Sequence, residues 1–347
     1  MDVSEFDYDL PEGRIAQHPL PERDASKLLV LDRRTGRIAH HVFRDLPELL
    51  APQDLLILND TRVIPARIFG KKEKTGGSVE VLLLEERGEG VWDCLAKGKS
   101  RLRVGTGIEF DEGVRGVVES TGGESERIQV RFPPPEVFRE WLSRRGHVPL
   151  PPYIRRPDSP EDRERYQTVY AETEGAAAAP TAGLHFTPGL LKQLDERGME
   201  RATITLHVGP ASFRPIRTGR VEDHVMDSER THVPPETGRR IEEARAAGRR
   251  IVAVGTTVVR ALEGRAEAGP HETFAIQPGW APVSLYITPG YRFRLVGGLL
   301  TNFHLPRSTL LVLVAAFAGR EHILKAYGEA LNKDYRFYSY GDAMLIR

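Results

Sequence analysis

Four short segments of the chain carry polar side chains among small residues, and three of them include a histidine. Glycine lets the backbone approach a ligand closely, while threonine, asparagine and backbone amides offer the neutral hydrogen bonds that adenosine and amino-acid groups need. Histidine exchanges a proton near neutral pH, as general base catalysis requires. The segments are 179–186 (APTAGLHF), 205–209 (TLHVG), 254–257 (VGTT) and 301–306 (TNFHLP).

A fifth segment, HVMDSE, places the imidazole of His224 and the carboxylate of Glu229 within a short reach. Each histidine also has a structural alternative. His207 lies in an apolar strand and could be a satisfied core histidine, His185 and His304 could cap loops, and His224 with Glu229 could be a surface pair. A zinc site is disfavoured because the histidines are scattered without a recognised ligand spacing. The prediction of a ligand site therefore depends on the whole set of segments.

Arginine and tyrosine residues cluster after a stiff proline-rich linker at 149–152. Such side chains can hold phosphates and stack on unpaired bases of an RNA loop. Composition gives no support for an RNA partner, because Lys plus Arg and Asp plus Glu are balanced at 49 each. Acidic residues are interspersed with the cluster, so a solvated charged face is the favoured alternative. The cluster comprises Arg155, Arg156, Arg163, Arg165, Tyr153 and Tyr166.

Several common enzyme motifs are missing from the sequence. No G-x-G-x-x-G follows a predicted strand, and the chain has no P-loop, H-E-x-x-H, C-x-x-C or G-x-S-x-G motif. The single cysteine, Cys94, lies in a predicted strand, and we interpret it as structural. A lone cysteine suits a cytoplasmic protein, and the acidic N-terminal segment lacks the apolar stretch of a signal peptide. We expect no membrane partner, because the longest apolar run, 310–318, is too short to span a bilayer.

The pattern of apolar runs and turns predicts an α/β fold interrupted by a small antiparallel β-barrel. Apolar strands at 27–32 and 54–58 precede closely spaced strands and Gly-rich turns from about residue 63, and an amphipathic helix follows at 136–145. Val137, Phe138, Trp141 and Leu142 are expected on one face of that helix. Strands then alternate with helices, which indicates parallel strands. The predicted architecture is a discontinuous, barrel-like α/β main domain, 1–62 and 152–347, with the β-barrel, 63–151, inserted.

Taken together, the polar segments resemble the S-adenosylmethionine:tRNA ribosyltransferase-isomerase family of the queuosine pathway. The resemblance covers essentially the whole chain. The strings that carry it are FDYDLP at 6–11, NDTRVIPAR at 59–67, YQTVYA at 166–171, the segments 179–186, 205–209, 254–257 (with Arg260) and 301–306 (with STL at 308–310), and YRFYSYGDA at 335–343.

Three departures from the family pattern are visible. Residues 211–213 read Ala-Ser-Phe where the family usually has Gly-Thr-Phe, and Asp227 stands where a second histidine is frequent. The stretch 277–282 looks like extra sequence, which we interpret as a loop change. The first two departures leave the roles of positions 211 and 227 in doubt.

The resemblance implies a reaction, a fold and a set of partners. The ribosyl part of S-adenosylmethionine would be transferred to the aminomethyl group of a 7-deazaguanine at the tRNA wobble position, giving epoxyqueuosine, adenine and methionine. S-adenosylmethionine is then a substrate, with no cofactor and no metal. The fold would combine an α/β domain with an inserted β-barrel. We expect the anticodon stem-loop of tRNA as the macromolecular partner of a monomeric protein.

Site residues are expected as follows within that resemblance. Either His185 or His207 is the base, with Glu229 or His224 as its partner. Binding of S-adenosylmethionine is assigned to Thr181, Thr257, Arg260, Asn302 and His304, and binding of tRNA to Arg62, Arg155, Arg156 and Tyr166. Two alternatives stay open: a tRNA-binding module without catalysis, and an ordinary methyltransferase, which would need a Gly-rich nucleotide loop after its first strand.

Overall fold

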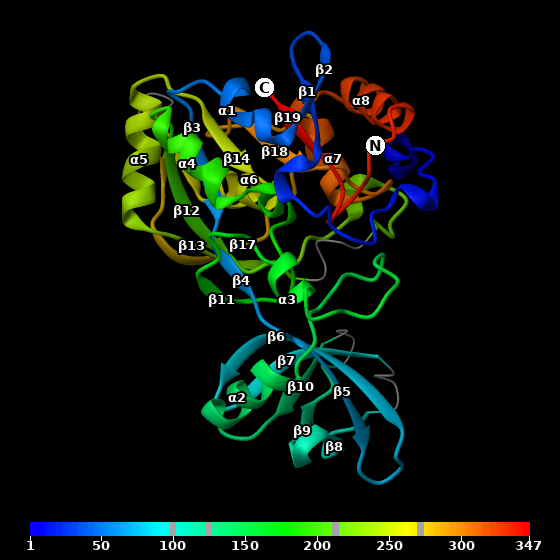
Figure 1. The fold of residues 1–347 in the computed structure, drawn as a ribbon. Helices are drawn as coiled ribbons and strands as arrows, with labels where there is room; N and C mark the ends of the chain where they lie inside the picture. Colours follow the sequence, from blue (N-terminus) through cyan, green and yellow to red (C-terminus); the bar gives the residue numbers. More distant parts are fainter. Residues whose placement is uncertain (98–101, 123–126, 210–214, 269–273) are drawn as a thin grey trace.

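The structure is a computed structural model that describes residues 1–97, 102–122, 127–209, 215–268 and 274–347. It has an α/β part built on a large sheet and, beside it, a closed β-barrel (Figure 1). Residues 211–213, where the sequence departs from the family pattern, lie outside the described ranges. In those ranges, no helix has both the length and the apolar character needed to cross a bilayer.

Nine strands form the large sheet. Its centre is parallel, with β12, β3, β14 and β18 side by side. The pairings that extend it on both sides are antiparallel, except for the parallel pair of β1 with β19. The order of the described strands has two ends, β17 and β2, so this part of the main domain is an open sheet and not the barrel-like one expected. In order, the strands are β17 (Gly279–Val283), β13 (Glu229–Val233), β12 (Glu200–Leu206), β3 (Leu55–Asn59), β14 (Ile251–Val254), β18 (Gly298–Asn302), β19 (Ala343–Ile346), β1 (Lys27–Leu31) and β2 (Ile38–Val42).

Helices cover both faces of this sheet. Alternate residues of β3 enter two different cores: Leu55 and Ile57 pack into one, and Leu56 and Leu58 into the other. This two-sided burial explains why the central strands are continuous apolar runs. The first core includes residues of α5 (Pro235–Ala246), α6 (Thr256–Gly264), α7 (Thr309–Ala318) and α8 (Arg320–Asn332), and the second includes residues of α1 (Leu46–Leu49) and α4 (Pro188–Glu196).

Six antiparallel strands close the barrel, as the alternating runs predict. They are β5 (Arg67–Lys72), β6 (Ser78–Gly88), β7 (Val91–Lys97), β8 (Gly107–Phe110), β9 (Arg115–Ser120) and β10 (Arg127–Arg131). Helix α2 (Pro135–Arg145) packs Phe138, Trp141 and Leu142 into the barrel core, which also buries Cys94. The assignment of Val137 to this apolar face is wrong, because its side chain is 55% exposed.

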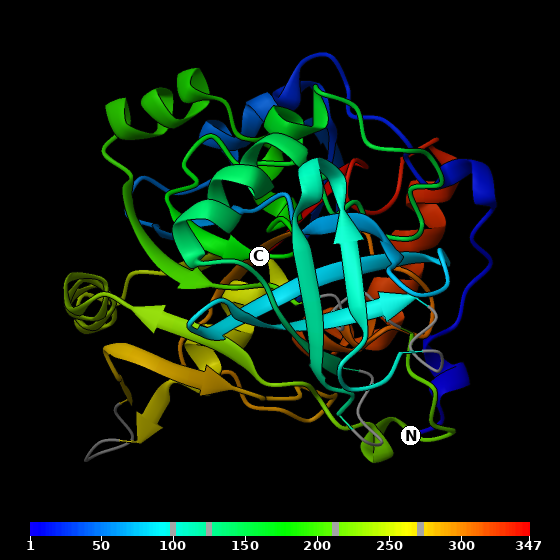
Figure 2. The same cartoon turned by 90° about the horizontal axis from the view of Figure 1, so that it is seen from below.

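A two-stranded parallel ladder connects the two parts of the molecule. Strand β4 (Thr61–Val63) leads from the large sheet toward the barrel and pairs with β11 (Thr173–Ala176) on the return path. In Figure 1 this ladder lies between the sheet and the barrel, and Figure 2 shows the barrel strands from below, crossing in front of the α/β part. The short helix α3 (Asp162–Arg165) lies on the same return path. The ladder therefore brings the segment that leads to the barrel and the segment that returns from it next to the ends of β12 and β13.

Candidate functional site

A large cavity lies where the barrel meets the edge of the main sheet. Its volume is about 820 Å³, which lies within the range of small-molecule sites. Strands β6, β7 and β10 and helix α2 supply the barrel side of the wall. The other side comes from the β4/β11 ladder, the residues after β12 and the start of β13. His207 and Glu229 both line this cavity, as the sequence segments predict.

The position of His207 is fixed by the strand that precedes it. Asn59, at the end of β3, donates from Nδ2 to the carbonyl of Leu206 at 2.9 Å and accepts from the Leu206 amide at 3.0 Å. The His207 ring contacts Thr61 through Nδ1, 2.8 Å from Oγ1, and stacks on Trp280 with a centroid distance of 5.7 Å. Burial lowers the pKa of His207 to about 4, so the ring is neutral at pH 7 and can accept a proton.

Glu229 is held at the cavity wall by a buried ion pair. Arg260 donates from Nη1 to Glu229 Oε2 at 2.6 Å and from Nε to the carbonyl of Leu285 at 3.2 Å. The two side chains are only 2% and 5% exposed. Among the described residues, Nη2 of Arg260 has no partner. The guanidinium of Arg260 contacts Glu229, and Arg260 is not among the residues that line the cavity. Arg260 therefore holds the Glu229 carboxylate in place.

A second, smaller cavity adjoins the first, and Val208 lines both. Its volume is about 30 Å³, enough for ordered water but far below that of a small-molecule site. It brings together four of the predicted binding residues, from three separate segments: Thr181, Thr257, Asn302 and His304. The convergence follows from topology, because β14 and β18 are parallel neighbours whose carboxyl ends meet at one edge of the sheet.

His185 is close to this group but lines neither cavity. Its ring is buried against Phe43, Nδ1 lies 2.9 Å from Ser26 Oγ, and Nε2 accepts from Asn302 Nδ2 at 3.3 Å. Burial lowers the pKa of His185 to about 4. With both ring nitrogens engaged, His185 orients Asn302, whose Oδ1 is buried without a partner in the described chain.

The other two histidines have different surroundings. His304 is buried, its Nε2 lies 2.9 Å from Thr301 Oγ1, and burial lowers its pKa to about 3. His224 packs edge-on against Tyr286 and lines neither cavity. No contact between His224 and Glu229 is present in the described ranges, so the structure does not bring this predicted pair together. Those ranges also contain no group of three or more side chains suited to hold a metal ion.

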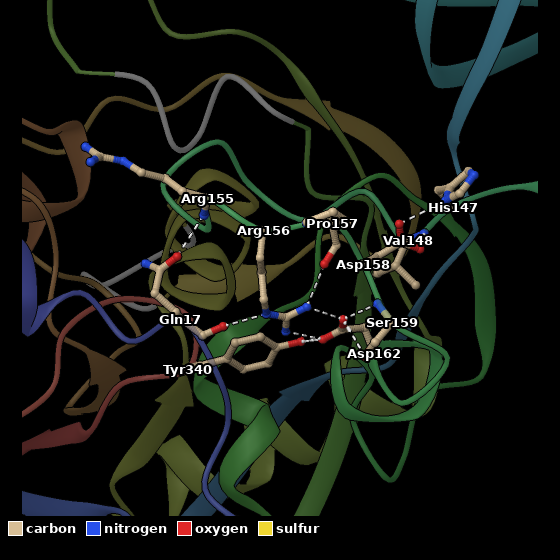
Figure 3. A network of polar contacts seen from close by, with 10 residues as sticks. All are labelled: Gln17, His147, Val148, Arg155, Arg156, Pro157, Asp158, Ser159, Asp162 and Tyr340. Atoms are coloured by element: carbon tan, nitrogen blue, oxygen red, sulfur yellow. Dashed lines mark hydrogen bonds and ion pairs between the residues drawn. The ribbon is translucent and has the colours of Figure 1, made fainter.

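The basic cluster separates into structural and exposed members. Arg156 forms a two-pronged pair with the buried carboxylate of Asp162, at 2.6 and 2.8 Å, and Tyr340 donates to the same carboxylate (Figure 3). Tyr166 is 1% exposed and packs on Tyr340. Stacking of Tyr166 on a tRNA base and contact of Arg156 with phosphate therefore do not fit this structure, because both side chains are committed to internal packing.

Two predicted tRNA contacts remain accessible. The guanidinium of Arg155 points away from the network in Figure 3, is 69% exposed and pairs with the exposed Glu12. Arg62 is half-buried and donates to the carbonyl of Ala171 beside the β4/β11 ladder.

Sequence reasoning missed three neighbours of His207. Thr61 belongs to the NDTRVIPAR string at 59–67, but no role in the site was expected for it. Gly175 lies in β11, which no apolar alternation signals, and Trp280 lies in the stretch taken for a loop change. That stretch instead contains β17, which pairs with β13. Thr61 could have been singled out from its place in a family string. The approach of Gly175 and Trp280 to His207 depends on strand pairing, which the local sequence does not show.

The fold and site define a class: an α/β protein with an inserted β-barrel and a histidine-lined cavity at the junction. The profile of the family described as "Queuosine biosynthesis protein" matches residues 3–346. Two relatives named S-adenosylmethionine:tRNA ribosyltransferase-isomerase, from Trichlorobacter lovleyi and Desulfitobacterium hafniense, are each 50% identical; the first match covers 99% of both chains and the second 100%. The chain belongs to the S-adenosylmethionine:tRNA ribosyltransferase-isomerase family of queuosine biosynthesis.

A solved structure supports the same assignment. The crystal structure of S-adenosylmethionine tRNA ribosyltransferase from Thermotoga maritima is similar to this chain, with a TM-score of 0.55 and 38% identity. The likeness covers 99% of this chain and 100% of that one. The similarity thus extends over the α/β part and the barrel together, as the sequence resemblance predicts.

Proposed function

We propose that this chain transfers and isomerises the ribosyl moiety of S-adenosylmethionine onto the aminomethyl-deazaguanine at the wobble position of tRNA. Epoxyqueuosine in tRNA, adenine and methionine are the products. The observation that carries the proposal is His207, a neutral imidazole on the wall of a cavity large enough for the donor. Family membership supplies the reaction, and the cavity supplies a place for it.

The charge of the cavity supports a cationic substrate. Five carboxylates and three guanidinium groups line it, a formal net charge of −2. Glu174, beside His207, has no ion pair or hydrogen bond from its carboxylate to another described residue. A sulfonium and two ammonium groups, one on the donor and one on the acceptor, are favoured in such a wall, whereas phosphate groups are not. The tRNA backbone is therefore expected outside the cavity, with only the modified base entering it.

The first step assigned to this site is removal of a proton from the ribose carbon bonded to the sulfonium. His207 takes that proton, and the resulting carbanion is stabilised by the positive sulfur beside it. Adenine leaves with the glycosidic electron pair and takes up a proton, the acceptor amine attacks the rearranged sugar, and methionine leaves when the carbon–sulfur bond breaks. We assign Glu229 as the partner of the base, because its carboxylate lines the same cavity as His207.

His207 is a better base than His185 on geometric grounds. Only one nitrogen of His207 is engaged, whereas both nitrogens of His185 are held by Ser26 and Asn302. Thr181, Thr257, Asn302 and His304 would contact the edge of the donor where the two cavities meet, because the small cavity itself has no room for an adenine ring. We assign Arg62 and Arg155 to tRNA phosphates of the anticodon stem-loop. We also propose a monomer that works in the cytoplasm without a cofactor.

A product analysis tests the reaction and the base together. The protein is incubated with S-adenosylmethionine and a tRNA carrying the aminomethyl-deazaguanine, and adenine and S-adenosylhomocysteine are quantified. We expect adenine, and a loss of about 10²–10⁴-fold in its release rate for His207→Ala. His224→Ala is the matched control and should keep the wild-type rate. S-adenosylhomocysteine as product would indicate a methyltransferase, and tRNA binding with neither product would indicate a binding module.

A further inference from the structure

The imidazole of His207 is enclosed by residues from three strands that are far apart in the sequence. Thr61 Oγ1 from β4 lies 2.8 Å from Nδ1, and Trp280 from β17 stacks nearly parallel to the ring, at an angle of 26°. The third neighbour is the backbone of Gly175 in β11. A Cβ added there would lie 2.8 Å from Cε1, 2.9 Å from Nε2 and 3.1 Å from Nδ1 of the ring. All three neighbours limit rotation of the imidazole.

The approach of Gly175 is produced by an irregularity in the β4/β11 ladder. Glu174 pairs with Arg62 and Ala176 with Val63, so Gly175 is an extra residue without a partner in the register. Its φ of +143° is a conformation that side-chain-bearing residues rarely adopt. A bulge of this kind re-aims the backbone, and bulges are frequent beside active sites. The ladder thus accommodates a glycine where the ring of His207 comes closest.

Trp280 is held over the ring by further contacts of its own. It also stacks on His232, at 4.9 Å between centroids, and the guanidinium of Arg230 lies 4.4 Å from its ring centroid. The register explains the arrangement, since Trp280 faces His232 across the β13/β17 pair, and the His207 amide donates to the carbonyl of Arg230. The indole is therefore a fixed cover for His207 although it is partly exposed.

We propose that Thr61, Gly175 and Trp280 are positioning residues for His207 in the transfer reaction. They hold the ring with Nδ1–H donating to Thr61 Oγ1, which leaves Nε2 unprotonated for the substrate. Nε2 has no hydrogen-bond partner in the described part of the chain, as a proton acceptor for an incoming ligand requires. This inference rests on the assignment of His207 as the base. A mere packing role for the three residues would affect stability without a specific effect through His207.

Single-turnover release of adenine distinguishes the two roles. We expect Thr61→Val and Gly175→Ala each to slow release by about 10²-fold, since a misplacement near 1 Å costs that much. Thr61→Ser keeps the hydroxyl and should restore most of the rate. Thr173→Val is the matched control: Thr173 pairs with Thr61 across the same ladder, but its hydroxyl bonds to Thr205 and not to His207. Trp280→Ala should slow release more than Trp280→Phe, because only phenylalanine keeps an aromatic cover.

A double-mutant cycle and a direct view of the ring complete the test. In a His207→Ala background, Thr61→Val should cause no further loss, because the residue acts only through the ring. Nitrogen NMR of the histidine-labelled protein should show a protonated Nδ1 and an unprotonated Nε2 for His207. A protonated Nε2, or an equal effect of Thr61→Val in both backgrounds, overturns the inference. Failure of the proposed reaction can be told apart from failure of this inference. In that case the wild-type protein would release no adenine, while the protonation of each His207 nitrogen could still be measured by NMR.

Discussion

The histidines of this site differ in what their ring nitrogens contact. Both ring nitrogens of His185 are engaged, by Ser26 and Asn302, and His304 contacts Thr301 through Nε2. His207 contacts Thr61 through Nδ1 and, unlike the other two, lines the large cavity. In all three the dominant cause of the lowered pKa is desolvation, which disfavours the charged ring. The same burial that keeps His207 neutral therefore makes the buried histidines sensitive to acid.

The pH dependence of stability follows from His304. Its pKa in the folded chain is about 3, and a histidine in the unfolded chain titrates near 6.5. Between these values the unfolded state binds a proton that the folded state does not, so this contribution is fully present above about pH 6.5 and is lost as the pH falls toward 3. We expect His304→Gln to reduce the loss of unfolding free energy between pH 7 and pH 5 by about 2 kcal/mol.

Urea unfolding of the wild type and the variant at both pH values measures this difference. His18→Gln is the matched control, because it makes the same substitution at an exposed histidine. Parallel pH dependence in wild type and His304→Gln would contradict the assignment of a buried neutral ring.

At the scale of elements, the sequence predicts most strands and helices but not the ladder that completes the site. Buried strands such as β3 and β14 are apolar on both faces, and Ser308 caps α7 as expected from its type and place. Strands β4 and β11 are three and four residues long and mostly polar, and their pairing depends on chain segments more than a hundred residues apart. No local periodicity encodes such a pairing, so the neighbours of His207 could not be predicted.

The ion pair between α6 and β13 is the element contact with the clearest energetic consequence. Removal of one partner from a buried ion pair costs about 3–5 kcal/mol, because the remaining charge loses its oppositely charged neighbour. We therefore expect Arg260→Met to destabilise the protein by that amount, because Glu229 stays buried at its side. Glu229→Gln combined with Arg260→Met should recover most of the loss. Denaturant titrations of the two variants provide the measurement, and a double variant no more stable than Arg260→Met would argue against the pair as the cause.

At the scale of the whole molecule, the charges are balanced in number but not in place. Lys plus Arg equal Asp plus Glu at 49 each, and the junction cavity is acidic. Two ion pairs cross that cavity from barrel to main sheet, Arg127 with Asp227 at 3.6 Å and Arg230 with Glu85 at 4.0 Å. Their side chains are 35–55% exposed, so each pair contributes little to stability. The covalent crossings and the β4/β11 ladder, and not these pairs, connect the two parts firmly.

An acidic cavity restricts where the tRNA backbone can lie, and this makes the exposed arginines testable as phosphate contacts. Each contact that releases a counterion adds to the slope of log K against log salt, and loss of one contact reduces the slope by about 1. We expect Arg155→Ala to weaken tRNA binding at low salt and to reduce this slope by that amount, without changing the affinity for S-adenosylmethionine. Arg44→Ala is the control, because Arg44 is likewise exposed and paired with an acidic residue, Glu22, but has no assigned role. Fluorescence anisotropy with a labelled anticodon stem-loop over a salt series measures both slopes. An unchanged slope for Arg155→Ala would indicate that tRNA docks on the barrel and not on the segment that returns from the barrel to the main sheet.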